Sequence, residues 1–223
     1  MQTNKHPNGS RQKQLILHQQ ALKQCQRCPQ MHGPVITGQP VLSKIILVGQ
    51  APGIHEAEVL KPFGWTAGKT LFQWFAGIGV DEETFRSKVY IASVCRCFPG
   101  KQVNKQGKTG GDRVPARDEI ERCSAWMRHE FELLQPEVII AVGKLAISQF
   151  IGVNKLVDII GSTHEIEKFD QRCTLIPLPH PSGASTWHRM EPGKTLLQEA
   201  LQLLAQHPAW QKISQPTPNK HKD

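Results

Sequence analysis

Four short apolar runs, separated by segments of helical periodicity, constrain the fold of this chain more than any other feature. Each run is dominated by aliphatic and other apolar residues and has the length of a buried strand. The runs are Lys44–Gly49, Val89–Val94, Val138–Gly143 and Thr174–Leu178. Because strands alternate with helices, the pattern predicts an α/β fold in which right-handed crossovers place helices on both faces of a sheet.

The segments between these runs predict five helices. Their residue ranges are about 11–27, 67–78, 116–134, 144–151 and 192–206. Pro115 and Pro192 lie where the first turn of a helix tolerates proline. We therefore expect a three-layer α/β/α sandwich with a central, mainly parallel four-stranded sheet. If His164–Phe169 forms a hairpin with the last strand, it adds an antiparallel edge strand.

The 223 residues suit one domain, which we place at 15–207, between a flexible tail at 1–14 and a flexible basic tail at 208–223. The polar N-terminal stretch does not resemble a signal peptide. No apolar run approaches the roughly 18 residues that a membrane span needs. These features predict a soluble, cytoplasmic, monomeric protein that has no membrane partner.

The charge balance favours a polyanionic partner. The formal net charge is +8 and the pI is near 9.3. Each neutralised phosphate releases condensed counterions, so a basic chain gains affinity for nucleic acid. The segment Lys101–Gly111 (KQVNKQGKTGG) has the look of an insertion and predicts either a flexible phosphate-contacting loop or a solvated loop without a function. A GxxxxGKS/T loop is absent from the sequence, which argues against a nucleotide hydrolase of that class.

The six cysteines are too sparse for a disulfide scaffold. Cys25 and Cys28 have the spacing of a metal chelate. Cys123 lies on an apolar stripe of its predicted helix and should face inward. A site with four thiolates suits an iron–sulfur cluster or zinc, and spacing alone does not choose between them. Cys95 and Cys173 are expected to be buried, small, apolar side chains.

Two loops should carry the chemistry. Gly49–Gly53 (GQAPG) follows the first strand, and His180-Pro181-Ser182 follows the last. In open α/β sheets, ligands bind beyond the carboxyl ends of the strands, so these loops should converge on one site. The turn Lys61–Gly64 and the Ala67-Gly68-Lys69 helix start lie between them in sequence.

These motifs together resemble a known family. GQAPG with KPFGWTAGK, YIASVCRCFPG, DRVPARDEIERC, EVIIAVGKLA and PHPSG occur in the order and positions typical of the family 4 uracil-DNA glycosylases, over residues 20–205. The resemblance implies a DNA glycosylase of base-excision repair, an N-glycosidic hydrolase whose partner is DNA containing damaged bases. Such an enzyme flips out a deaminated base, uracil above all, stabilises the departing base anion and positions a water.

The resemblance also implies roles for individual residues. It implies that a 4Fe-4S cluster is held by Cys25, Cys28, Cys97 and Cys123, with zinc as the alternative. It implies catalysis by His180, Glu56 and Gln50, and binding of the base by Gln50, Phe63, Ser93 and His180. Contacts to DNA are expected from Ser182, Lys101, Lys105, Lys108, Arg113 and Arg189. Trp187 is either a wedge that enters the duplex or a core anchor.

The chain departs from the family pattern at three places. Gln50 replaces the glutamate of the first motif, Ser93 replaces a base-reading asparagine, and Gly183 stands where a proline often follows the serine. Without the asparagine, two-point recognition of the uracil edge is lost unless another group replaces it. A second hypothesis is therefore a non-catalytic or altered-specificity protein that binds lesions or single-stranded DNA on the same fold.

Overall fold

The computed structural model describes residues 7–104 and 106–215, with a five-stranded sheet in the middle layer. The strand order is β2-β1-β5-β7-β6. The strands are β1 (Ile45–Gly49), β2 (Tyr90–Ser93), β5 (Val138–Val142), β6 (His164–Lys168) and β7 (Gln171–Leu178). The α/β sandwich predicted from the sequence is confirmed, with one more strand than the four expected.

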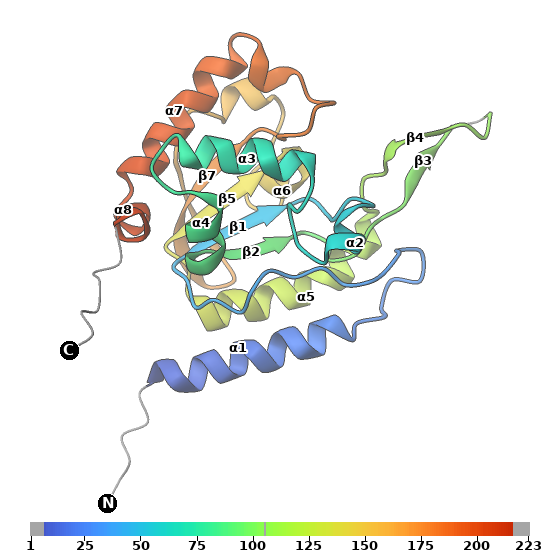
Figure 1. The fold of residues 1–223 in the computed structure, drawn as a ribbon, viewed down its shortest axis with the longest axis horizontal. Coiled ribbons are helices and arrows are strands. Elements are labelled where there is room, and N and C mark those ends of the chain that lie inside the picture. The colour runs from blue at the N-terminus through green and yellow to red at the C-terminus, as the bar shows by residue number, and fades with distance from the viewer. Residues whose placement is uncertain (1–6, 105, 216–223) are drawn as a thin grey trace, which may run out of the picture.

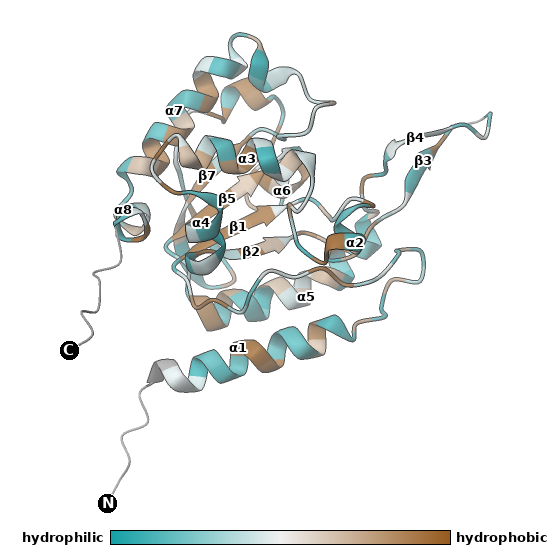
Figure 2. Cartoon of the chain, in the orientation of Figure 1, coloured by the Kyte–Doolittle hydropathy of each residue, from teal (hydrophilic) through white to brown (hydrophobic). Residues whose placement is uncertain are grey.

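The four apolar runs form the parallel part of this sheet. β1 pairs in parallel with β2 and with β5, and β5 pairs in parallel with β7. Every residue of β1, β2 and β5 is buried, because helices cover both faces. Figure 2 shows β1 and β5 in shades of brown, inside more hydrophilic helices.

The fifth strand, β6, forms a hairpin with β7 at the edge of the sheet. Lys168 pairs with Gln171 across a two-residue turn. Both turn residues, Phe169 (φ 51°) and Asp170 (φ 60°), are left-handed, as a tight hairpin turn requires. The sequence raised this hairpin as an option, and the structure contains it.

Helices form the two outer layers. Figure 1 shows α1 (Pro7–Lys23) and α5 (Arg117–Leu134) on one side of the sheet, with α3 (Thr66–Ala76) and α7 (Gly193–Gln206) on the other. The remaining helices are short. They are α2 (Glu56–Val59), α4 (Glu82–Lys88), α6 (Lys144–Ser148) and α8 (Pro208–Ser214), with single turns of 3₁₀ helix at Leu156–Asp158 and Trp187–Arg189.

Several of these helices differ from expectation: α2 was not predicted, and α6 ends at Ser148, three residues before the expected end. α1 begins at Pro7, within the segment expected to be a tail, and ends at Lys23, before the cysteine pair. α4 was not predicted, although the Asp81 carboxylate accepts a hydrogen bond from the Thr84 N–H (2.7 Å) and so caps it. α8 occupies the start of the other expected tail. Residues 1–6 and 216–223 of those tails lie outside the described residues.

Helix α8 is held to the body by Trp210. Its side chain is almost completely buried, near the stacked rings of Phe75 and Phe85. Its indole N–H donates to the Ile78 carbonyl (3.2 Å). Because a buried indole contributes a large apolar area and has its polar atom satisfied, this contact orders a segment that local sequence marks as polar.

A two-stranded ribbon replaces the loop expected at Lys101–Gly111. β3 (Lys101–Val103) pairs antiparallel with β4 (Thr109–Asp112), and both strands are exposed along their length. Figure 1 shows the ribbon projecting from the body, away from α8. Within the described ranges, no helix is both long and apolar enough to span a membrane.

Candidate active site

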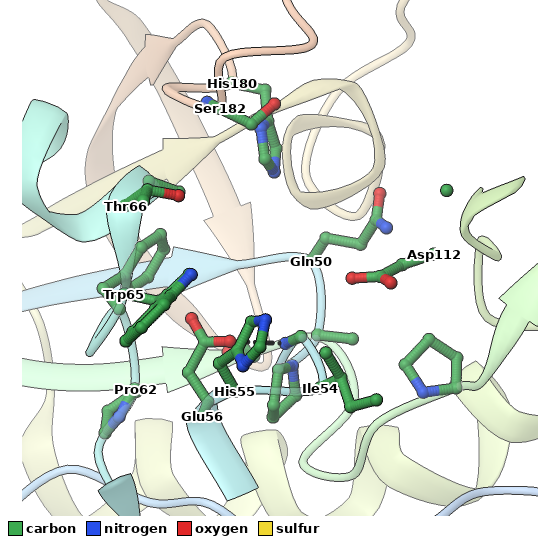
Figure 3. Close-up of a pocket in the computed structure, with 18 of the residues that line it drawn as sticks. Gln50, Ile54, His55, Glu56, Pro62, Trp65, Thr66, Asp112, His180 and Ser182 are labelled. Carbon is green, nitrogen blue, oxygen red and sulfur yellow. Dashed lines mark hydrogen bonds between the residues drawn. The ribbon is translucent and has the colours of Figure 1, made fainter. Parts of the chain in front are cut away.

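A cavity of about 460 Å³ lies beyond the carboxyl ends of the parallel strands. Gln50 enters it directly after β1, Ser93 ends β2, Val142 ends β5, and His180 follows β7. Figure 3 shows the His180 ring pointing into this pocket, while Glu56 enters from the opposite side. The two loops singled out in the sequence therefore converge, as the geometry of an open sheet requires.

Six residues expected in the site line this one pocket. They are Gln50, Glu56, Phe63, Ser93, His180 and Ser182. They come from three segments that are far apart in the sequence, residues 50–63, Ser93 and residues 180–182, and each of these segments lies at the carboxyl end of a parallel strand.

The Phe63 ring lies against the end of β1. A Cβ added at Gly49 would meet Cζ of this ring at 2.6 Å, so only glycine fits beneath it. A Cβ at Gly68 would meet the Phe63 carbonyl oxygen at 1.8 Å, so α3 also needs glycine where it passes the turn. Phe63 itself is left-handed (φ 52°), a strained conformation that surrounding contacts must hold.

Arg86 supplies those contacts. Its guanidinium donates to the Pro62 carbonyl (3.0 Å) and to the Phe63 carbonyl (3.0 Å), and Nε donates to Glu82 (2.7 Å). The same group lies 4.5 Å from the centroid of the Phe72 ring. A planar guanidinium can make all these contacts at once, so α4, which was missed in the sequence, positions the turn that carries Phe63.

His180 is held as a neutral ring with a defined tautomer. Burial, and secondarily the neighbouring His188, lower the pKa of His180. The backbone N–H of Ser182 donates to its Nδ1 (3.2 Å). Because an accepting ring nitrogen carries no proton, the neutral imidazole has its proton on Nε2 and can donate it into the pocket.

Glu56 is hydrogen-bonded to the loop that follows β1. Its carboxylate accepts a hydrogen bond from the Gly53 N–H (2.8 Å). Burial nevertheless raises its pKa, and the negative charge of Asp112 raises it further, against the lowering effects of this hydrogen bond and of His55. A carboxylate with a raised pKa in a cavity suits proton transfer or the positioning of water.

Residues 36–205 match the family described as "Uracil DNA glycosylase superfamily". The chain belongs to this superfamily. It is 30% identical to the type-4 uracil-DNA glycosylase of Archaeoglobus fulgidus over 147 residues, which are 63% of this chain and 66% of the relative. It is 29% identical to the type-4 uracil-DNA glycosylase of Pyrobaculum aerophilum over 152 residues, 65% of this chain and 70% of the relative. A third relative, the type-4 uracil-DNA glycosylase of Thermotoga maritima, is 28% identical over 151 residues, 66% of this chain and 71% of the relative.

The ribbon brings an unexpected carboxylate to the pocket of this superfamily member. Asp112, at the end of β4, lies 3.2 Å from the Cβ position of Gly53, beside Glu56. Lys101 at the start of β3 donates to Asp112 (2.6 Å). Sequence reasoning missed Asp112, because only the pairing of the two ribbon strands reveals that it lies opposite Lys101.

Two aromatic residues of the pocket wall were also missed. The rings of His55 and Trp65 are stacked, with centroids 4.5 Å apart and an interplanar angle of 28°. Both residues line the cavity. In the sequence, His55 precedes Glu56 and Trp65 lies two residues after Phe63. These positions could have predicted that both residues lie near the site, but not what they do there.

The residues expected to contact DNA have different environments. Lys108 is exposed on the ribbon, and Arg189 is exposed beside His188. Lys101 is paired with Asp112, and Arg113 forms a bidentate pair with Glu119 (2.7 and 2.6 Å) near the start of α5. Lys105 lies outside the described residues. Of the ribbon lysines that are described, Lys108 is the one with no ion pair.

Trp187 packs as an anchor. A Cβ at Gly193 would meet Cδ2 of its indole at 2.7 Å, so the ring lies directly on the first turn of α7. The side chain is only partly exposed and packs against the core. This contact favours the core role of Trp187 over that of a wedge.

Four cysteines of the chain line a second cavity, of about 520 Å³, between the segment that ends α1, the segment after β2 and helix α5. Its walls include Cys25, Cys28, Cys97 and Cys123. In the described part of the chain, no group of three or more His, Cys, Asp or Glu side chains converges tightly enough to hold a single metal ion. Zinc needs ligands at about 2.0–2.3 Å from one point. The ligands of a polynuclear cluster surround a larger body than a single ion does.

The two remaining cysteines are buried, as expected. The Cys95 thiol donates a hydrogen bond to the Cys123 sulfur, which lowers the pKa of Cys123 and raises that of Cys95. Cys97, and not Cys95, contributes to the wall of the cavity.

Proposed function

We propose that this chain is a DNA glycosylase that hydrolyses the N-glycosidic bond of a deaminated base, with uracil as the first candidate. The observation that carries the proposal is the state of His180, a neutral ring that presents an Nε2–H donor to the pocket shared with Glu56 and Phe63. Relatives whose names state uracil-DNA glycosylase activity support the same reaction class.

His180 would act on the departing base. Cleavage of the glycosidic bond leaves negative charge on the base, and a donor aimed at that charge stabilises the transition state more than the ground state. A neutral donor also avoids placing a second positive charge beside the oxocarbenium-like sugar. The tautomer imposed by the Ser182 N–H supplies this donor without a proton from solvent.

Glu56 would act on the other side of the reaction. An ionised carboxylate stabilises the positive character of the sugar and can orient or deprotonate the attacking water. Its hydrogen bond to Gly53 fixes its position. Gln50 cannot be a base, but its amide can orient the same water or bond the edge of the extruded base.

The base itself would lie against Phe63, whose ring offers an apolar face next to the end of β1. Ser93, at the end of β2, contributes a hydroxyl that both donates and accepts. A hydroxyl matches either carbonyls or ring N–H groups of a base, so we expect recognition to be broader than that of an asparagine side chain.

We also propose that Cys25, Cys28, Cys97 and Cys123 hold a 4Fe-4S cluster. When bound, the cluster would cross-link the segment after α1, the segment after β2 and helix α5, and these cysteines line a different cavity from that of the proposed reaction. Thiolate ligation is the chemistry that such clusters use.

The decisive experiment incubates the protein with labelled oligonucleotides that carry one uracil, hypoxanthine, xanthine or mismatched thymine, and then cleaves abasic sites with alkali. We expect strand breaks at uracil with the wild type and with His164→Ala, a partly buried histidine on β6 outside the pocket. His180→Ala should give breaks far more slowly. The proposal is wrong if the wild type releases none of these bases.

Gln50 and Ser93 favour one other candidate, a lesion-binding protein without catalysis, because both replace residues of the family pattern. Its signature in the same experiment is selective binding of the uracil oligonucleotide without any alkali-sensitive site.

A further inference from the structure

The stacked pair of His55 and Trp65 has no role in the proposed reaction. Both rings line the pocket, but the proposed reaction assigns neither of them to the base or to the water. In Figure 3 the pair lies near Glu56, on the side of the pocket opposite His180.

Trp65 is unusually open to solvent for a tryptophan. Trp65 is 45% exposed even though His55 covers part of one face, and the His55 side chain is 45% exposed. Neighbouring Ile54 is 43% exposed. Tryptophan is highly buried on average, so an exposed, stacked pair at the mouth of a cavity indicates a surface for a planar ligand.

The pair is held in a fixed relation to Phe63. Trp65 follows Phe63 by two residues, after the turn that Arg86 holds by hydrogen bonds to the Pro62 and Phe63 carbonyls. A Cβ at Gly64 would meet the Lys61 carbonyl oxygen at 2.7 Å and a Val59 methyl carbon at 2.6 Å, so only glycine fits at this position of the tightly packed turn. A rigid platform stacks a ligand at low entropic cost.

The charge around the pair is mixed, and that of the whole chain is positive. Lys61 and Lys69 are exposed on the same turn and on the following helix, whereas the Glu58 carboxylate lies 3.5 Å from Nδ1 of His55. The chain carries a net charge of +8. Stacked aromatic faces on a basic chain fit a nucleic-acid strand, whose bases stack on the rings while its phosphates pair with cations.

We propose that His55 and Trp65 form a stacking subsite for a second base of the substrate strand, next to the base held at Phe63. A base can occupy this subsite only when it is free of its partner strand, so the substrate class is single-stranded or locally melted DNA. This inference rests on the proposed glycosylase function for the assignment of the first base, but the subsite itself is a binding property.

The test measures binding of the full-length protein to a fluorescein-labelled single-stranded oligonucleotide without any lesion, and to the matching duplex, by anisotropy. Loss of one base–aromatic stack corresponds to roughly tenfold weaker binding, which we expect for Trp65→Ala on the single strand only. Trp65→Phe keeps an aromatic face and should stay within about threefold of the wild type. His55→Ala should fall between these two variants.

The matched control is Leu17→Ala, which removes an apolar side chain that is 63% exposed on α1, outside the pocket. Its affinity should equal that of the wild type. Circular dichroism should show that all variants remain folded, and Trp65→Phe provides the comparison if Trp65→Ala does not. The proposal is overturned if Trp65→Ala binds the single strand as tightly as the wild type, or if it weakens single-strand and duplex binding equally.

Because the probe carries no lesion, this result is independent of catalysis. If the wild type excises no base but Trp65→Ala weakens single-strand binding, the subsite proposal stands and the glycosylase proposal is wrong. If the wild type excises uracil and Trp65→Ala binds the single strand normally, the glycosylase proposal stands and the subsite proposal is wrong.

Discussion

The backbone N–H of Ser182 donates to Nδ1 of His180 at 3.2 Å, and this contact determines which proton the ring can offer. The loop after β7 therefore does more than bring a histidine to the pocket. It selects the Nε2–H tautomer, while burial keeps the ring uncharged by lowering its pKa.

His180→Ala should reduce the single-turnover rate of base release roughly 10²–10³-fold, because it removes a donor that acts on charge developed in the transition state. The affinity for lesion DNA should remain almost unchanged. Rapid-quench kinetics and anisotropy measure the two quantities separately. Equal losses in binding and rate would instead make His180 a residue that positions the DNA.

The pH dependence of the rate should report Glu56. Burial and Asp112 raise its pKa, and the reaction needs the carboxylate, so the rate should fall as the pH drops through that raised value. Asp112→Asn removes a negative charge beside Glu56, which lowers the pKa of Glu56 and keeps the carboxylate ionised at lower pH. The acid limb of the kcat/KM profile should therefore move to lower pH.

The lysine partner of Asp112 acts in the same direction, because Asp112→Asn frees the Lys101 ammonium, and a nearby cation also favours the ionised form of Glu56. Lys212→Ala, an exposed cation on α8, is the control and should leave the profile in place. An acid limb that does not move, or that moves to higher pH, would show that Glu56 is not the group that titrates.

The parallel core of the fold could be predicted because each of its strands is buried on both faces and therefore reads as a continuous apolar run. Helix α8 could not, because its order depends on a distant contact of Trp210 with Phe75 and Phe85. The ribbon was also missed, since its exposed strands have no apolar face to mark them.

The same distinction holds for the site. Gln50 and His180 directly follow core strands, so the topology predicts that they meet. Asp112 reaches the pocket only through ribbon pairing, and Arg86 acts on Phe63 from a helix that crosses to the turn. Neither contact can be predicted from hydrophobic periodicity, because each depends on the three-dimensional path of a loop.

Arg86→Ala should impair base binding without touching the reacting groups. It removes two donors from the Pro62 and Phe63 carbonyls and releases the left-handed Phe63. Hydrogen bonds from charged groups contribute about 1.5–3 kcal/mol each, so we expect the free energy of unfolding to fall by about 3 kcal/mol or more. The KM for uracil DNA should rise more than kcat falls.

Arg86→Lys should recover part of the loss, because an ammonium can reach one carbonyl but cannot reproduce the planar fork. Glu82→Gln, which removes the partly exposed partner of Arg86, is the control and should cost no more than about 1 kcal/mol. Chemical denaturation and steady-state kinetics give both readouts. If Glu82→Gln lowers stability and raises KM as much as Arg86→Ala does, the effect comes from the ion pair and not from the hydrogen bonds to the turn.

The proposed cluster predicts a brown protein with about four irons per chain. Cys97→Ala and Cys123→Ala should lose the colour and the iron, because both side chains line the cysteine cavity. Cys95→Ala and Cys173→Ala should keep both, since neither lines it. Visible absorption and metal analysis measure the outcome, and one zinc per chain in a colourless protein would contradict the cluster.

The ribbon provides a final prediction, about salt. Lys108 is exposed and has no ion pair in the described structure, whereas Lys101 is bound to Asp112 (2.6 Å). Each phosphate contact changes the slope of log affinity against log salt by roughly 0.7–0.9. Lys108→Ala should therefore reduce the slope for lesion-free DNA by about that amount, because a free ammonium can replace the counterions of one phosphate.

Lys101→Ala should change the slope by less, because its ammonium already neutralises a carboxylate of the pocket and would have to leave it in order to reach DNA. Lys212→Ala, on the side of the molecule away from the ribbon in Figure 1, should leave the slope unchanged. Anisotropy titrations at several salt concentrations measure all three slopes. An unchanged slope for Lys108→Ala would remove the ribbon from the DNA contact surface, and a full change for Lys101→Ala would mean that DNA breaks its pair with Asp112.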